Sequence, residues 1–78
     1  MKLGLYQHYK GNLYQVLGVA RHSETPHDPL VIYQALYGDY GLWARPQGMF
    51  EEMVTYQNKT MPRFALVSEN LSTPPKIH

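Results

Sequence analysis

The sequence predicts a small, mainly β domain, namely a five-stranded SH3-like barrel with one short helical turn. Two observations support this fold class. Segments rich in β-branched and aromatic residues alternate with short clusters of Gly, Pro, Asn and Asp, as expected for strands joined by turns. The chain has 78 residues, which allows one domain with a single core. An OB-like barrel is the alternative arrangement of the same strands.

Residues 30–46 form the predicted central hairpin, with residues 39–41 as its loop. In this register alternate side chains share a face of the hairpin. One face is aliphatic, and the other carries aromatic rings and an arginine: Ile32, Leu36, Leu42 and Ala44 on the first, and Tyr33, Ala35, Tyr37, Trp43 and Arg45 on the second. We expect the aliphatic face to fill the core. Trp43 is then partly exposed, unless the barrel wraps around both faces and buries it.

The first hairpin is predicted from residues 5–10 and 13–23, with the two residues between them as its loop. In this register Leu5 and Tyr14 lie on the less polar side, which we expect to face the core. Apolar residues also occur on the opposite side of the second strand. A strongly bent strand would reconcile these two patterns, and Gly18 is the expected bend.

The remaining elements are shorter. Residues 24–29 contain two prolines and are expected to form a loop. Apolar side chains in residues 49–53 have the spacing of one helical turn. Residues 55–62 are interpreted as a polar connection, and residues 63–67 as the last strand.

The folded domain is predicted to span residues 1–67, followed by a loosely ordered C-terminal tail over residues 68–78. The tail contains Ser, Thr, Asn and two adjacent prolines, and it has no periodic apolar pattern. We therefore expect the tail to be dispensable for folding.

Composition argues against several classes of protein. Seven Lys and Arg balance six Asp and Glu to a net charge of +1, and the positive residues form no basic stripe, so strong phosphate-driven nucleic-acid binding is not indicated. The absence of cysteine removes disulfides and thiolate metal sites. No apolar run is long enough for a signal peptide or a membrane span. These features predict a cytoplasmic protein with no cofactor and no membrane association.

The segment His22-Ser23-Glu24 contains the residue types of a catalytic triad. In an extended chain, however, Ser23 faces away from His22 and Glu24, whereas a nucleophile needs its base within hydrogen-bond reach. We therefore favour a structural role, in which His22 is partly buried at a strand end and held by Glu24 or a backbone carbonyl. The histidines and carboxylates show no metal-ligand spacing, so neither a catalytic residue nor a metal site is predicted.

A binding site is predicted on the aromatic face of the central hairpin. Aromatic rings beside an arginine are typical of surfaces that bind a peptide or stack a base. The sequence therefore predicts a non-enzymatic binding module for a protein segment or single-stranded nucleic acid, and the lack of a basic stripe favours a protein or peptide. The predicted binding residues are Tyr33, Tyr37, Trp43, Arg45, His22 and Glu24.

Two other classes of function stay open. One is a small hydrolase-like enzyme centred on His22, Ser23 and Glu24, which requires a concave pocket lined by titratable groups. The other is a structural homodimerisation domain with the aromatic face as its interface, which requires a large self-complementary apolar patch.

Four motifs and a final tripeptide also resemble a known family. They are HYKG at residues 8–11, ARHSET at 20–25, YQALYGD at 33–39, LWARPQGMF at 42–50 and Pro-Arg-Phe at 62–64. Over Tyr6 to Phe64 the chain resembles the bacterial domain-of-unknown-function 1653 family. The pattern departs from the family after HSET, where Pro26-His27-Asp28 replaces an expected acidic pair. The resemblance implies a small bacterial cytoplasmic β domain and no particular reaction.

Overall fold

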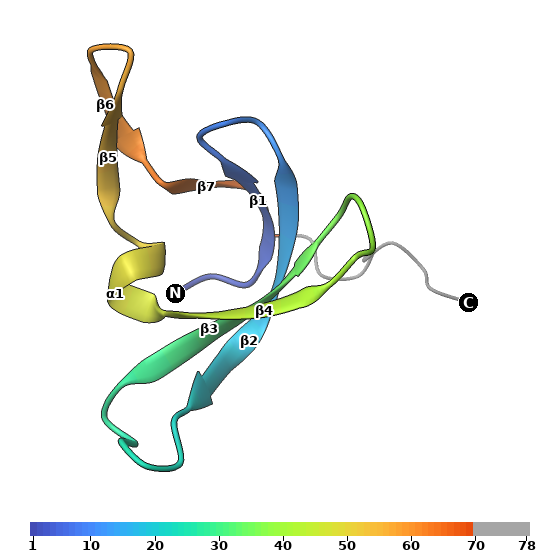
Figure 1. Ribbon diagram of the computed structural model, residues 1–78, viewed down its shortest axis with the longest axis vertical. Coiled ribbons are helices and arrows are strands. Elements are labelled where there is room, and N and C mark those ends of the chain that lie inside the picture. Colours follow the sequence, from blue (N-terminus) through green and yellow to red (C-terminus); the bar gives the residue numbers. More distant parts are fainter. Residues whose placement is uncertain (70–78) are drawn as a thin grey trace.

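The computed structural model describes residues 1–69, which form seven strands and one short helix (Figure 1). The elements in chain order are β1 (Gly4–His8), β2 (Leu13–Arg21), β3 (Pro29–Ala35), β4 (Leu42–Pro46), α1 (Gln47–Phe50), β5 (Met53–Tyr56), β6 (Lys59–Pro62) and β7 (Phe64–Ser68). Five strands form an antiparallel sheet in the order β4-β3-β2-β1-β7, and β5 pairs with β6 in a separate two-stranded sheet. The mainly β class is confirmed. Within these residues, no helix has the length and apolarity needed to cross a bilayer.

The closed SH3-like barrel is not confirmed. Strands β4 and β7 stand at opposite edges of the five-stranded sheet and do not pair. Residues 55–62, predicted as a connection, lie mostly in the β5–β6 hairpin, which projects away from the larger sheet (Figure 1). The turn residues of this hairpin, Gln57 (φ 52°) and Asn58 (φ 63°), both lie in the left-handed region that a tight two-residue loop requires. The prediction was wrong here because glutamine is not a residue that marks such a turn.

The register of the first hairpin also differs from the prediction. Tyr6 lies opposite Tyr14, so Tyr6 rather than Leu5 points into the core. Strand β1 ends at His8, whose backbone N–H donates to the carbonyl oxygen of Asn12 at 2.8 Å. The loop is therefore longer than two residues. The pairing moves by an odd number of residues, and an odd shift exchanges the two faces of a strand.

The register of the central hairpin preserves the predicted faces. Tyr33 lies opposite Trp43, and Val31 lies opposite Arg45. The loop is again longer than predicted, but the pairing is displaced by four residues, an even number. The aromatic rings and Arg45 therefore share one face, as the sequence indicated.

The core lies on this aromatic face, which reverses the prediction. Tyr33 is only 5% exposed, whereas Leu42 on the aliphatic face is 65% exposed. Two rings from other elements decide the side: Phe50 of α1 and Phe64 of β7 stack with their centres 4.1 Å apart. The rings of Tyr6 and Tyr33 meet Phe50 edge-on at 5.4 and 5.3 Å. These are favourable aromatic geometries, and they pack this face of the sheet against the two phenylalanines.

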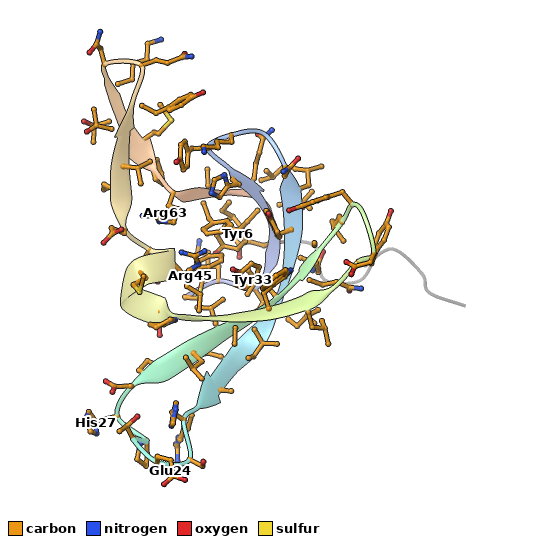
Figure 2. The ribbon with its side chains drawn as sticks, viewed as in Figure 1. Tyr6, Glu24, His27, Tyr33, Arg45 and Arg63 are labelled. Atoms are coloured by element: carbon orange, nitrogen blue, oxygen red, sulfur yellow. The ribbon has the colours of Figure 1, made fainter. Side chains whose placement is uncertain are left out.

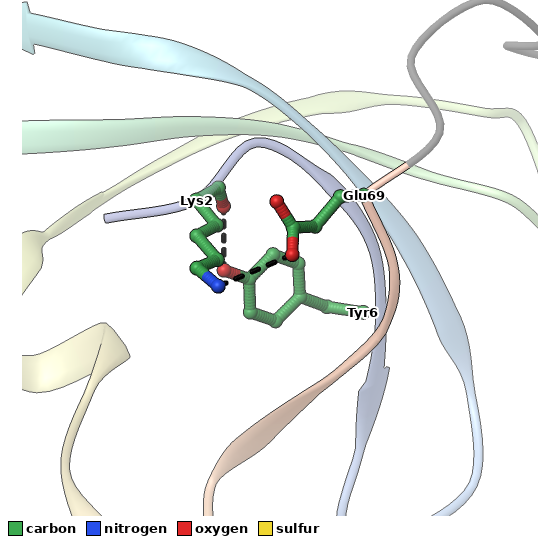
Figure 3. A network of polar contacts seen from close by, with 3 residues as sticks. All are labelled: Lys2, Tyr6 and Glu69. Atoms are coloured by element: carbon green, nitrogen blue, oxygen red, sulfur yellow. Dashed lines mark hydrogen bonds and ion pairs between the residues drawn. The ribbon is translucent and has the colours of Figure 1, made fainter.

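The two ends of the described chain meet where β1 runs beside β7. Gly4 has φ +141°, and a Cβ atom at this position would overlap the carbonyl oxygen of Ser68. The Tyr6 hydroxyl donates to the backbone oxygen of Lys2 at 2.5 Å, and the Lys2 ammonium pairs with Glu69 at 3.1 Å (Figure 3). Strand β7 thus extends to Ser68, one residue beyond the predicted domain boundary. Residues 70–78, the rest of the predicted tail, lie outside the described residues.

Candidate functional site

Five side chains from three strands and the β3–β4 loop surround a small cavity at the rim of the core. The cavity has a volume of about 180 Å³ and is lined by Tyr14 of β2, Tyr33 of β3, Tyr37 of the β3–β4 loop, and Trp43 and Arg45 of β4. The four aromatic and arginine residues predicted from the central hairpin are therefore brought together. Figure 2 shows Arg45 and Tyr33 side by side, close to α1 and to Tyr6.

Tyr14 is the lining residue that the sequence reasoning did not assign to the site. It lies opposite Ala35 in the sheet, and its hydroxyl lies 2.6 Å from that of Tyr37. Its pairing with residue 35 could not be read from the two hairpins considered separately. A tyrosine on the predicted core side of residues 13–23 was the available signal, since a buried phenol requires a polar partner.

The lining residues differ in depth. Tyr33 is buried at the bottom of the cavity, whereas Tyr37 is 43% and Trp43 is 58% exposed at its rim. The exposure of Trp43 agrees with an open aromatic face and not with a barrel that wraps around it. The rim is thus accessible to solvent, while the bottom of the cavity belongs to the packed core.

Hydrogen bonds leave several donors available at this site. The Nε–H of Arg45 donates to the Tyr33 hydroxyl oxygen at 3.3 Å, and its guanidinium carbon lies 5.9 Å from the centre of the Phe64 ring. Because the Tyr33 oxygen accepts this bond, its own O–H is available to donate. In the Tyr14–Tyr37 pair, whichever hydroxyl accepts likewise retains its proton for another acceptor.

The electrostatics of the cavity favour an anion. No lining residue is acidic, and no carboxylate of residues 1–69 forms an ion pair with Arg45. Burial, and then the hydrogen bond with Tyr37, raise the pKa of Tyr14 to about 12, so this phenol is neutral and protonated at neutral pH. The site therefore combines one unpaired cation with neutral hydroxyl donors.

The other two predicted binding residues lie elsewhere. Figure 2 shows Glu24 at the end of the molecule formed by the β2–β3 loop, away from Arg45 and Tyr33, which lie near the middle. His22 is exposed rather than partly buried, and its Nδ1 accepts the backbone N–H of Glu24 at 3.1 Å. The expected partial burial was wrong because this loop extends beyond the core.

His22 contributes to a second, larger cavity of about 630 Å³ between the β2–β3 loop and the start of α1. Its lining is mostly apolar and includes Pro29, Leu30, Pro46 and Met49. Ser23 and Glu24 do not line it. Among residues 1–69, no group of three or more His, Asp or Glu side chains is arranged to hold a metal ion.

Comparison with known proteins places the chain in a family. Residues 4–66 match the family of proteins of unknown function termed DUF1653. The chain belongs to the DUF1653 family. A crystal structure of a DUF1653 protein from Bordetella bronchiseptica has a similar fold, with a TM-score of 0.79 and 38% sequence identity, over 86% of this chain and 87% of that one. No match was found among curated proteins.

Proposed function

We propose that this DUF1653 protein is a binding module that holds a segment of a protein partner, with an acidic side chain of the segment in the cavity beside Arg45. One observation carries the proposal: Arg45 has no anionic partner among residues 1–69, yet it lies partly buried in a cavity whose other polar groups are phenols and an indole. A desolvated guanidinium gains most from a carboxylate that accepts two of its hydrogen bonds.

The size and composition of the site favour a protein ligand. A cavity of about 180 Å³ accommodates one side chain, while the exposed rings of Tyr37 and Trp43 offer contact area to the residues around it. Tyrosine, tryptophan and arginine are the residues that dominate protein-binding hot spots. Nucleic acid would instead require several cations along a path, and the cavity contains one.

The alternative functions have less support. The Nδ1 atom of His22 is occupied by a backbone N–H, and Ser23 forms no hydrogen bond with His22 among the described residues, so a hydrolase lacks its nucleophile–base pair. A homodimer formed through the aromatic rim is an outcome that the experiment below would detect.

The test is a titration with terminally blocked pentapeptides, followed by Trp43 fluorescence and NMR. We expect Thr-Val-Glu-Val-Thr to bind, and its counterpart with Gln in place of Glu to bind roughly tenfold more weakly, because the charged hydrogen bond is lost. Arg45→Gln should remove this preference. Arg21→Gln, at the exposed end of β2, is the control because it changes the net charge equally.

Several results would contradict the proposal. These are equal binding of the Glu and Gln peptides, or an equal effect of the two arginine substitutions. Tighter binding of an oligothymidylate than of the Glu peptide would assign the site to nucleic acid. Self-association that Trp43→Ala abolishes would make the rim a homodimer interface.

A further inference from the structure

We propose that the partner segment docks as an additional β-strand along the free edge of β4. This inference rests on the proposed function and specifies how the segment reaches the cavity. It follows from the direction of the backbone groups of β4 and from the position of two cavity residues on that strand.

Strand β4 is an edge strand. It pairs with β3, and no other strand of residues 1–69 lies beside it in the sheet. The edge is short, from Leu42 to Pro46, because α1 begins at the next residue.

The register determines which backbone groups of this edge are unpaired. The N–H of Ala35 donates to the carbonyl oxygen of Gly41 at 3.0 Å, so these two residues form a hydrogen-bonded pair. Hydrogen-bonded and non-hydrogen-bonded pairs alternate along an antiparallel ladder. The backbone groups of Leu42 and Ala44 therefore point away from β3. Pro46 also occupies a position whose backbone points away from β3, so its lack of an N–H removes no hydrogen bond between β3 and β4.

An added strand would present its side chains to the cavity. Neighbouring strands lie about 4.8 Å apart, and side chains at facing positions are in contact. Trp43 and Arg45 point to the cavity side of β4. An acidic side chain beside Arg45 would thus meet the guanidinium, and a side chain two residues away would lie against the exposed indole.

The opposite face of β4 defines the rest of the partner. Leu42 and Ala44 are exposed there, and Leu42 has the largest exposed fraction of the large apolar residues within 1–69. Alternate residues of the added strand would cover them, so apolar side chains are favoured at these positions. The partner is therefore an extended segment of a protein that alternates an acidic residue with apolar ones. The other sheet edge, β7, contributes no side chain to the cavity.

Ala44→Pro tests the strand addition directly. It removes one outward N–H and leaves the β3–β4 hydrogen bonds intact, and Trp43 before it is already in the extended conformation that a following proline requires. We expect this variant to bind the Glu pentapeptide roughly tenfold more weakly, as for one lost hydrogen bond. Its NMR response to acetate, a probe of the cavity alone, should match that of the unaltered protein. Ala44→Thr, which keeps the N–H, is the matched control.

Amide hydrogen exchange gives a second readout that needs no substitution. The Glu pentapeptide should slow exchange at the amides of Leu42 and Ala44, whereas acetate should not. If Ala44→Pro fails to fold, the exchange measurement alone tests whether the peptide adds to the sheet as a strand. Unchanged exchange at both amides, or undiminished peptide binding by a folded Ala44→Pro variant, would overturn strand addition while leaving the Arg45 site in place. Failure of both acetate and the peptide to bind the unaltered protein would overturn the proposed function, and this inference with it.

Discussion

Replacing Trp43 with alanine should weaken the fold much less than emptying the core. Trp43 is 58% exposed at the cavity rim, whereas Phe50 is 1% exposed between the rings of Phe64, Tyr6 and Tyr33. The two substitutions therefore form a matched pair. Each removes a large aromatic ring, but only one removes a ring that the core needs.

The exposed fractions set the magnitudes. A fully buried aromatic side chain covers about 150–250 Å². Trp43 covers about two-fifths of that, or at most roughly 100 Å², and at about 25 cal/mol per Å² its removal costs at most about 2.5 kcal/mol. Phe50→Ala should cost about 3–5 kcal/mol, because it also leaves a cavity. A core of this size supplies only about 3–5 kcal/mol in total, so Phe50→Ala should leave the domain largely unfolded.

Urea denaturation followed by far-UV circular dichroism measures both variants, since this signal does not depend on the tryptophan. Acrylamide should quench the fluorescence of Trp43 readily in the unaltered protein, and no other indole contributes. A shielded Trp43, or a Trp43→Ala variant as unstable as Phe50→Ala, would show that the ring belongs to the core and would refute the assignment of the rim.

Three further perturbations address other parts of the fold. Gly4→Ala forces a side chain into a positive-φ position against the Ser68 carbonyl, and should cost about 2 kcal/mol or more, lowering Tm by roughly 10 °C. Burial, and then the charge of Arg63, lower the pKa of His8, so the folded state binds a proton less readily than the unfolded chain. The stability due to His8 should therefore be complete above about pH 6.5 and decline as the pH falls below it, which Tm measured from pH 7 to 5 will show. Glu52→Gln removes the carboxylate 2.7 Å from the largely covered Arg63 guanidinium, and should cost about 1 kcal/mol in urea denaturation.

Each of these has a control. Gly48→Ala places a Cβ in open space and should leave Tm nearly unchanged; an equal loss in both glycine variants would contradict the close approach of β1 and β7. His8→Asn retains an acceptor for the neighbouring backbone N–H and should show a smaller acid-induced decline, so an identical decline would exclude His8 as its source. Glu51→Gln changes the net charge equally at an exposed site, and a matching cost there would argue against the ion pair.

The shared face of Tyr33, Trp43 and Arg45 was predictable because side chains alternate between the two faces of a β-strand. The loop of the central hairpin was assigned too short, yet Tyr33, Trp43 and Arg45 still share a face, since the error moved the register by an even number of residues. In the first hairpin the same kind of error moved the register by an odd number, and Tyr6 rather than Leu5 entered the core. Face assignments from sequence are thus only as secure as the parity of the assumed loop.

The side of the hairpin that faces the core was not predictable from the hairpin itself. Its aliphatic face has the more apolar composition, but the covering rings come from Phe50 and Phe64, which lie outside the hairpin. The β5–β6 hairpin was not predicted because its turn places Gln57 at positive φ, and glutamine is not a residue type that indicates such a turn. Tyr14 lines the cavity because β2 pairs with β3, and the sequence of the β2–β3 loop contains no turn motif that predicts the register of this pairing.

The pairing of β1 with β7 also governs when the cavity beside Arg45 is completed during folding. Leu5 lies opposite Ser68, so this pair closes a loop of about 60 residues, at an entropic cost of roughly 3–4 kcal/mol. Only then does Phe64 reach the core and take its place under the Arg45 guanidinium. During translation the first four strands emerge before the ring that completes their core, so folding must wait until β7 has left the ribosome. The cavity beside Arg45 is completed at the same moment, because β7 carries the Phe64 ring that lies against the Arg45 guanidinium.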